Sequence, residues 1–183
     1  MNYYIDIKLI LSKEIQENIL LNQLYTNFHK RLYDLNKYSI GVSFPRYKLK
    51  LGNVFRIHGS KIDLEMLQKV DWVNELLKFC DVSEISLVPD GVEYRIVSRI
   101  QTTMSQSKLR RLIKRGSIKE EDIKTYKAKL FQKSLGNPFV ELISMSNGER
   151  HRRFIQFSDL SKNQIKGSFD LFGLSKTATV PWF

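Results

Sequence analysis

The chain has 183 residues and a formal net charge of +11, a length that suits one large domain or two small ones. Residues 1–95 hold 13 Lys and Arg against 12 Asp and Glu, whereas residues 96–183 hold 17 against 7, so the second half is predicted to bind a polyanion. A single cysteine, Cys80, excludes an intrachain disulfide and a cysteine-based zinc site, and no apolar run of about 18 residues is present to span a membrane.

The first half of the chain alternates between strand and helix patterns. Tyr4–Leu9 alternates apolar and polar residues, which predicts a strand, and helical spacing of apolar residues predicts helices over 14–35 and 62–79. The other expected strands are 40–45, 54–58, 84–88 and 94–101. This β-α-β-β-α-β order predicts a ferredoxin-like domain over residues 1–97.

A short basic helix is predicted from Lys108 to Arg115. Its apolar residues fall on one side, and its cations fan over the other. The cations are Lys108, Arg110, Arg111, Lys114 and Arg115. No acidic residue occurs between Glu93 and Glu120 to neutralise them. A solvated helix is the ordinary reading of such a pattern, but this arrangement repels itself unless a polyanion binds, which favours a nucleic-acid backbone.

The remaining part of the second half is predicted to form a small α/β domain. A mixed-charge helix is expected over 119–133, and strands are expected over 139–146, 152–157 and 169–172. Asn147-Gly148 predicts a hairpin turn, and the residues up to Phe183 have few charges and are expected to dock on the fold. We therefore predict an α+β protein in which the first domain packs on a smaller domain, residues 98–183, that carries the arginine-rich helix.

Few residues offer catalytic chemistry. His29 lies late in the first expected helix, where a histidine without a function is the more common case. Imidazole is nevertheless the natural proton acceptor near neutral pH. RNA supplies its own nucleophile, the 2′-hydroxyl, so a ribonuclease needs only a base, an oriented phosphate and a binding surface. The chain has three histidines and no carboxylate cluster, HxxxH or phosphate-binding loop, so we expect neither a metal nor a cofactor.

Two further groups of polar residues stand out. Ser144 and Ser146 precede the expected hairpin turn and bring hydroxyls close to turn amides, although serine fills many hairpins for conformational reasons alone. His151 lies in a second basic cluster, residues 150–153, and can stack on a base or contact a phosphate.

Sequence elements spread over nearly the whole chain resemble one known family. They are Tyr4–Ile7 (YIDI), the helix with His29, Ile40–Pro45 (IGVSFP), Tyr94–Gln101 (YRIVSRIQ), the basic helix, Ser144–Ser146 (SMS), Gly173–Ser175 (GLS) and Val180–Phe183 (VPWF). The chain resembles the CRISPR-associated repeat endoribonuclease of type I-F systems, which matures CRISPR RNA.

The resemblance implies a catalytic site. His29 would accept or relay the proton of the 2′-hydroxyl, and Ser144 would hold that hydroxyl or its ribose. Ser146 and Phe172 would support the site. In-line attack on the adjacent phosphate then gives a 2′,3′-cyclic phosphate and a 5′-hydroxyl without a metal.

The resemblance also implies a binding surface and partners. Arg99 and Gln101 match the pair that contacts base edges at the foot of the RNA stem, which suits the bidentate chemistry of both side chains. The basic helix would contact stem phosphates in the major groove. The implied partners are the CRISPR RNA stem-loop, to which the protein stays bound, and other subunits of a type I-F effector complex. Neither a membrane nor a metal is expected, and the single cysteine fits a reducing cytoplasm.

One position near the implied site departs from the family pattern. Phe172 stands where the family often has a tyrosine, so a hydroxyl contact with His29 is missing. Ring packing can replace that contact, or Tyr25 or Tyr33 can supply it. Because His29 and Ser144 are both present, we expect the chain to be active.

Two positions on the implied binding surface also depart from the pattern. Leu112 occupies a position of the basic helix where relatives carry arginine, and His151 stands where the family stacks an aromatic ring on the terminal base pair. Two other functions stay open. A noncatalytic clamp for an RNA hairpin is the main alternative, and a basic DNA-binding accessory protein is a third.

Overall fold

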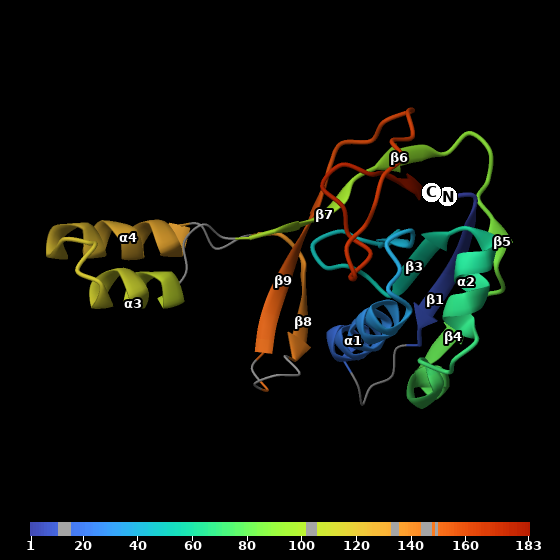
Figure 1. Cartoon of the computed structure of the whole chain (residues 1–183), viewed down its shortest axis with the longest axis horizontal. Coiled ribbons are helices and arrows are strands. Elements are labelled where there is room, and N and C mark those ends of the chain that lie inside the picture. Colours follow the sequence, from blue (N-terminus) through green and yellow to red (C-terminus); the bar gives the residue numbers. More distant parts are fainter. Residues whose placement is uncertain (11–15, 102–105, 133–135, 144–147, 149) are drawn as a thin grey trace.

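The computed structural model describes residues 1–10, 16–101, 106–132, 136–143, 148 and 150–183. Within these residues the chain combines antiparallel sheets with helices, as expected for an α+β protein. Figure 1 shows a body that holds the sheets and a pair of helices that extends from one end of it.

The first sheet is built around a central strand near the start of the chain. Its strands are β1 (Tyr3–Leu9), β2 (Gly41–Ser43), β3 (Val54–Gly59), β4 (Cys80–Val82) and β5 (Ser86–Leu87). β1 pairs antiparallel with β3 on one side and with β4 and β5 on the other, and β3 pairs with β2. The strand order is therefore β2-β3-β1-β4.

The closing strand of this sheet differs from the expected one over residues 84–88. The fourth position is taken first by β4, and only residues 86–87 pair further along β1. Between them the backbone N–H of Ser83 donates to the Asp6 carbonyl at 2.8 Å, and the Ser83 hydroxyl accepts from the Asp6 N–H at 2.9 Å. The pairing begins earlier than predicted because Cys80 is already buried against the core.

Two helices cover one face of this sheet. α1 (Glu17–Leu35) lies beside α2 (Lys61–Gln68), and Arg31 on α1 donates to the Met66 carbonyl on α2 at 2.9 Å. The second helix expected over 62–79 is two elements, because α2 ends at Gln68 and a separate 3₁₀ helix, η1, spans Asn74–Phe79.

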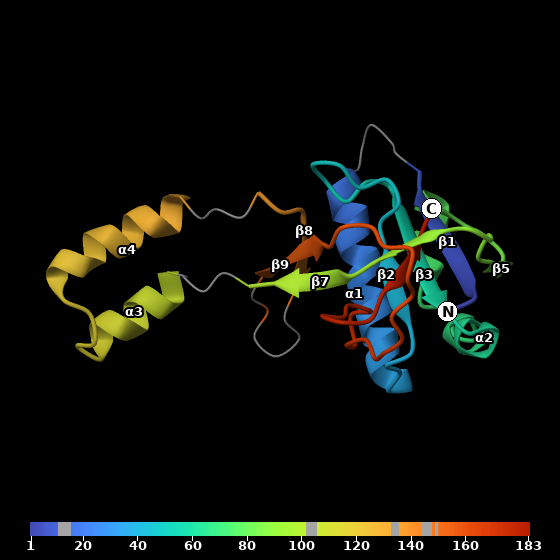
Figure 2. The ribbon, with the colours of Figure 1, turned by 90° about the horizontal axis from the view of Figure 1, so that it is seen from above.

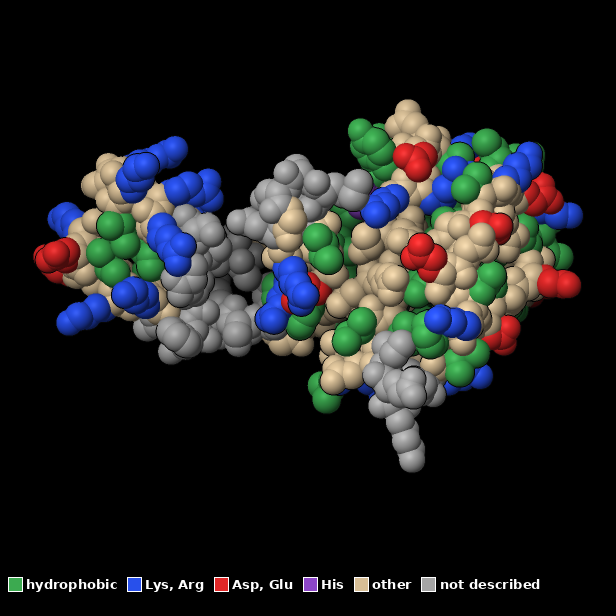
Figure 3. Space-filling model, turned by 90° about the horizontal axis from the view of Figure 1, so that it is seen from below, with side chains coloured by type: hydrophobic (Ala, Val, Ile, Leu, Met, Phe, Trp, Pro, Cys, Tyr) green, Lys and Arg blue, Asp and Glu red, His purple; other side chains and the backbone are tan. Residues whose placement is uncertain are grey.

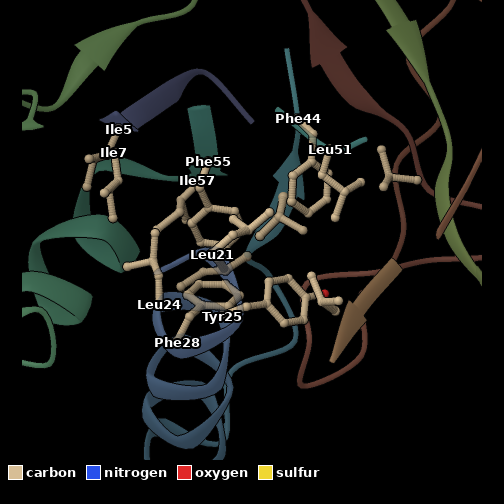
Figure 4. Close-up of a cluster of buried hydrophobic side chains, with 14 of the residues drawn as sticks. Ile5, Ile7, Leu21, Leu24, Tyr25, Phe28, Phe44, Leu51, Phe55 and Ile57 are labelled. Atoms are coloured by element: carbon tan, nitrogen blue, oxygen red, sulfur yellow. The ribbon is translucent and has the colours of Figure 1, made fainter. Parts of the chain in front are cut away.

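The hydrophobic core lies between α1 and the sheet. Figure 4 shows Leu24, Tyr25 and Phe28 of α1 facing Phe55 and Ile57 of β3. The same buried cluster continues into the second half of the chain, where its members include Val97, Val140, Ile155, Leu174 and Val180. The two halves thus share buried contacts, and the division at residues 97 and 98 stays a prediction.

The second half adds two small antiparallel sheets. β7 (Val97–Ile100), β8 (Phe139–Ile143) and β9 (Arg150–Phe157) form one in the order β7-β9-β8, and β6 (Glu93–Arg95) pairs with β10 (Val180–Trp182) in the other. The single strand expected over 94–101 is therefore divided between two sheets. Its middle residue, Ile96, bonds instead to Ser158 through both its N–H and its carbonyl.

Near the end of the chain one expectation is confirmed and one is wrong. The last residues are docked as expected, through β10 and through Arg56, whose Nη1 donates to the Phe183 carbonyl at 2.7 Å. Residues 169–172, expected as a strand, instead form part of a loop with a turn at Leu171 and Phe172.

The basic helix and the helix after it stand away from the body (Figures 1 and 2). α3 spans Gln106–Lys114 and α4 spans Glu120–Gln132, close to the expected bounds. α3 ends at Lys114, and Gly116 shortly after it has a φ of +63°, the left-handed conformation that favours glycine after a helix. Leu109 is buried, whereas Ile113, predicted for the same apolar side, is 47% exposed.

Candidate active site

The candidate site is organised by the loop of residues 169–175, which passes the edge strand β2 beside α1. Asp170 shapes this loop, because its Oδ1 accepts from the backbone N–H groups of Phe172 and Leu174, each at 2.9 Å. The backbone N–H of Asp170 also donates to the Leu174 carbonyl at 2.7 Å, and that of Gly173 to the Asp170 carbonyl at 2.9 Å. The chain therefore makes a tight turn that presents Phe172 at its tip.

Gly173 lets this loop lie directly against the sheet. Its φ is +70°, and a Cβ at this position would lie 2.7 Å from Cγ1 of Val42, so no other residue fits without displacement. The Val42 N–H donates to the Gly173 carbonyl at 3.0 Å, and the Ser175 N–H donates to the Val97 carbonyl at 3.0 Å. The GLS element thus ties the loop to both halves of the chain.

His29 projects from α1 toward this loop and is half-buried. Its Nδ1 lies 2.8 Å from the carbonyl oxygen of Leu171. A carbonyl oxygen can only accept, so Nδ1 carries the hydrogen and donates it. In the neutral imidazole, Nε2 is then the nitrogen with a free lone pair, as a general base requires.

Phe172 packs on the imidazole. The two ring centroids lie 3.5 Å apart with an interplanar angle of 13°, so the rings are stacked. The hydroxyl of the fully buried Tyr25 donates to the Phe172 carbonyl at 2.8 Å, and Tyr33 is 68% exposed. Tyr25 therefore supports the loop backbone, and ring packing is the contact that His29 makes here.

The surroundings of His29 lower the pKa of its imidazole. Burial is the largest cause, because it disfavours the charged form, and the charge of Arg153 acts in the same direction. The hydrogen bond to Leu171 and the charge of Asp170 oppose these effects. The imidazole is consequently held in its neutral form at neutral pH.

Arg153 of β9 completes this cluster. The sequence did not single it out as a site residue. Its guanidinium carbon lies 3.3 Å from the Phe172 ring centroid, and its Nη1 lies 3.8 Å from Oδ2 of Asp170. The sequence showed only a basic cluster over residues 150–153. Strand alternation was the usable signal, because it separates Arg153 and buried Ile155 from their neighbours on the other face.

The two predicted base-contacting residues lie together at the end of β7. With its amide oxygen facing the guanidinium, Gln101 accepts from Arg99 Nη2 at 2.6 Å and from Nη1 at 3.2 Å. Both side chains line an open cavity of about 730 Å³ together with Asp170 and residues 174–177. Asp170 also contacts Arg153, so this residue belongs both to the cavity wall and to the cluster around His29.

The five predicted cations of the basic helix are all exposed, on α3 and directly after it. They are Lys108, Arg110, Arg111, Lys114 and Arg115. Figure 3 shows Lys and Arg side chains gathered over this protruding part, with most of the visible acidic side chains on the body. The helix therefore offers a cationic surface several residues long, separate from the His29 cluster.

The other predicted residues are only partly placed. His151 is exposed on β9, opposite Leu142 of β8. Its neighbour Arg152 faces the other way and pairs with Glu141, with Nε 3.4 Å from Oε2. Ser144, Ser146 and Asn147 of the expected Asn147-Gly148 turn lie outside the described residues, and β8 ends at Ile143 just before them.

The described part of the chain offers no metal centre and no membrane-spanning helix. Within it, no three His, Cys, Asp or Glu side chains lie together as a metal centre would need. None of its helices has the length and apolar character that crossing a bilayer demands.

Comparisons with known proteins cover the whole chain. A sequence model of the family described as CRISPR-associated protein (Cas_Csy4) matches residues 4–183. The chain is 34% identical over 184 residues to a protein named CRISPR-associated endonuclease Cas6/Csy4 from Escherichia coli (strain UTI89 / UPEC). It is 35% identical over 187 residues to a protein of the same name from Pseudomonas aeruginosa (strain UCBPP-PA14), and each match covers 100% of both chains.

Proposed function

The chain belongs to the Csy4 family of CRISPR-associated proteins, and from this premise we propose that it is a metal-independent endoribonuclease that cleaves CRISPR repeat stem-loops in precursor RNA. The endonuclease name of its relatives supports the reaction class. The contacts of His29 support the mechanism.

The observation that carries the proposal is the fixed tautomer of His29. Its Nδ1–H is held by the Leu171 carbonyl at 2.8 Å, which leaves Nε2 as the proton acceptor. Burial lowers the pKa of the imidazole and so keeps this acceptor neutral at physiological pH. A half-buried histidine whose Nδ1–H is held by a backbone carbonyl has the tautomer that a general base requires.

The proposed reaction uses the RNA's own nucleophile. Nε2 of His29 takes the proton of the 2′-hydroxyl, and the resulting oxygen attacks the adjacent phosphorus in line. A new P–O2′ bond forms, the P–O5′ bond breaks, and the departing oxygen takes up a proton. The products are a 2′,3′-cyclic phosphate and a 5′-hydroxyl. On the resemblance, Ser144 holds the 2′-hydroxyl or its ribose, Ser146 supports it, and Phe172 supports His29.

The proposed RNA contacts divide between two surfaces. Arg99 and Gln101 contact base edges at the foot of the stem, next to the His29 cluster, whereas the exposed cations of α3 contact stem phosphates. His151 is proposed to stack on the terminal base pair. Because all of these contacts are to the stem, the protein would stay bound to its 3′ hairpin product after cleavage and could act as a subunit of an effector complex.

The finer description of the fold is also a proposal. The order β2-β3-β1-β4 with α1 and α2 on one face supports a ferredoxin-like first domain over residues 1–97. The smaller sheets and α3 support an RNA-binding second domain over residues 98–183. The cytoplasmic location inferred from the single cysteine, Cys80, stays a prediction.

The decisive experiment compares wild type with His29→Ala on the cognate repeat RNA in excess EDTA. We expect wild type to cleave and to leave a cyclic phosphate, and we expect His29→Ala to bind equally well while cleaving about 100-fold to 10,000-fold more slowly. Cleavage that survives the substitution would remove His29 as the base. Tight binding without cleavage by wild type would show instead a noncatalytic clamp, with Phe172 in place of tyrosine as the first cause to test.

A further inference from the structure

Phe172 is enclosed between two side chains from different elements. The imidazole of His29 lies 3.5 Å from its ring centroid, and the guanidinium carbon of Arg153 lies 3.3 Å from the same centroid. Two planar groups cannot both lie so close to one centroid on the same face without overlapping each other. The three side chains therefore form a stack, His29 then Phe172 then Arg153.

The stack holds a charge that is mostly out of solvent. The Arg153 side chain is only 12% exposed, and among the described residues its Nε is buried without a hydrogen-bond partner. Its ion pair with Asp170 is long, at 3.8 Å, and Asp170 already bonds two backbone N–H groups of the loop. A hydrophobic residue would fill this place at lower desolvation cost, so packing alone does not account for an arginine here.

The charged and titratable groups around the stack come from four elements. Arg153 of β9 and Asp170 of the loop shift the pKa of the His29 imidazole. Tyr25 of α1 and Arg99 of β7 shift the pKa of the Arg153 guanidinium. Burial lowers the pKa of the Arg153 guanidinium most, and the charge of Arg99 lowers it further. The positive charge of Arg153 in turn lowers the pKa of His29 and so favours the neutral base.

We propose that Arg153 is a positioning residue of the ribonuclease site, which presses the Phe172 ring against His29 and thereby fixes the imidazole for proton acceptance. This inference rests on the proposed function. It assigns a role to the phenylalanine that departs from the family pattern. Because Phe172 offers no hydroxyl, a planar cation on its far face supplies the fixation by cation–π attraction and stacking.

The test begins in the free protein, where it is independent of catalysis. The imidazole of His29 is titrated by NMR in wild type, Arg153→Gln and Arg152→Gln. Arg152→Gln is the matched control, because it removes the same charge one residue away on the opposite face of β9, where Arg152 pairs with Glu141. We expect Arg153→Gln to raise the pKa of His29 and Arg152→Gln to leave it unchanged.

The second measurement is single-turnover cleavage of the repeat stem-loop as a function of pH. We expect Arg153→Gln to move the rising limb of the pH–rate profile to higher pH and to lower its plateau about tenfold, because the imidazole loses its orientation. Binding of a stem-loop with a 2′-deoxyribose at the cut should change equally in Arg153→Gln and Arg152→Gln. Arg153→Lys keeps the charge but not the planar surface, so it should lower the plateau without moving the limb.

The outcomes separate this inference from the proposed function. If Arg153→Gln titrates and cleaves like Arg152→Gln while His29→Ala is inactive, the ribonuclease stands and the role of Arg153 is wrong. If His29→Ala cleaves like wild type, the proposed function fails. If Arg153→Gln does not fold, as judged by thermal melting, the test rests on Arg153→Lys. A cleavage plateau of Arg153→Lys equal to that of wild type then overturns the proposal.

Discussion

The cluster around His29 and the basic helix α3 differ in how their side chains are held: the first is fixed by contacts within the protein, and the second is exposed. His29, Phe172 and Arg153 are held by contacts with named partners from α1, β9 and the loop of residues 169–175. The cations of α3 are exposed, on a helix that stands away from the body. Under the proposed function, the first region would fix atoms for a proton transfer, whereas the second would offer charge to a phosphate backbone. One chain can therefore separate the accuracy of cleavage from the strength of binding, and substitutions should reveal that separation.

The largest expected effect comes from Gly173→Ala. Its φ of +70° costs an alanine about 1–2 kcal/mol, and the contact with Val42 adds about 1–3 kcal/mol, so the loop must move away from His29. We expect cleavage to fall at least about 100-fold while α3 still binds the stem. Gly91→Ala is the control, because Gly91 has a φ of +72° with nothing within 4 Å of a Cβ. Equal losses in both variants would remove the special role of the loop.

The next effect concerns pH. A general base acts in its neutral form, so the cleavage rate should rise with pH through the pKa of His29. Burial lowers this pKa, so wild type should reach its plateau at a lower pH than an ordinary imidazole would and lose activity as the pH falls through the lowered value. Phe172→Ala exposes the imidazole and should move the midpoint upward, whereas His151→Ala should not move it. A wild-type midpoint above the ordinary histidine value of 6.5 would contradict the description of the site.

A smaller effect is expected for base recognition by Arg99. Arg99→Ala should cost about 1–3 kcal/mol of discrimination at one base pair, because a bidentate contact is lost. Lys176 lines the same cavity and serves as the control, since Lys176→Ala should weaken all stem sequences alike. The measurement is competition binding with stems that differ at each pair in turn. An unchanged base preference in Arg99→Ala would end its readout role.

The smallest effect is expected on α3. Arg110→Ala should lower the salt dependence of stem binding by about one phosphate contact and should leave the bound cleavage rate unchanged. Lys61→Ala is the matched control, because Lys61 is exposed on α2 in the body, and this variant should leave the salt dependence of stem binding unchanged. A loss of cleavage rate in Arg110→Ala at saturating protein would show that α3 and the His29 cluster are not separate in function.

Apolar periodicity predicted most of the fold because burial dictates it. The residues that define α1, β1 and β3 in the sequence are those that fill the core between them. The expected strand over 169–172 failed because Asp170 bonds the N–H groups of Phe172 and Leu174, and this local turn chemistry outweighs strand propensity. The strand over 94–101 divided because Ser158, which lies 62 residues away, bonds both the N–H and the carbonyl of Ile96.

The candidate site was only partly predictable. The resemblance named His29 and Phe172, and the structure adds the contact that fixes the tautomer of His29 and the stack on Phe172. The role of Leu171 was not predictable, because a backbone carbonyl has no sequence signature. Strand alternation could separate the face of Arg153, but it could not show that Phe172 and Asp170 of a distant loop pack against it. The role of Ser144 in the site stays a prediction.

The hydrogen bond between His29 and Leu171 joins residues 142 positions apart. During synthesis on the ribosome, the histidine emerges long before the carbonyl that fixes it. A nascent or truncated chain that ends before residue 171 therefore has the imidazole without its orientation, even if α1 and β1 have already folded. Nuclease activity should therefore appear only when synthesis is nearly complete.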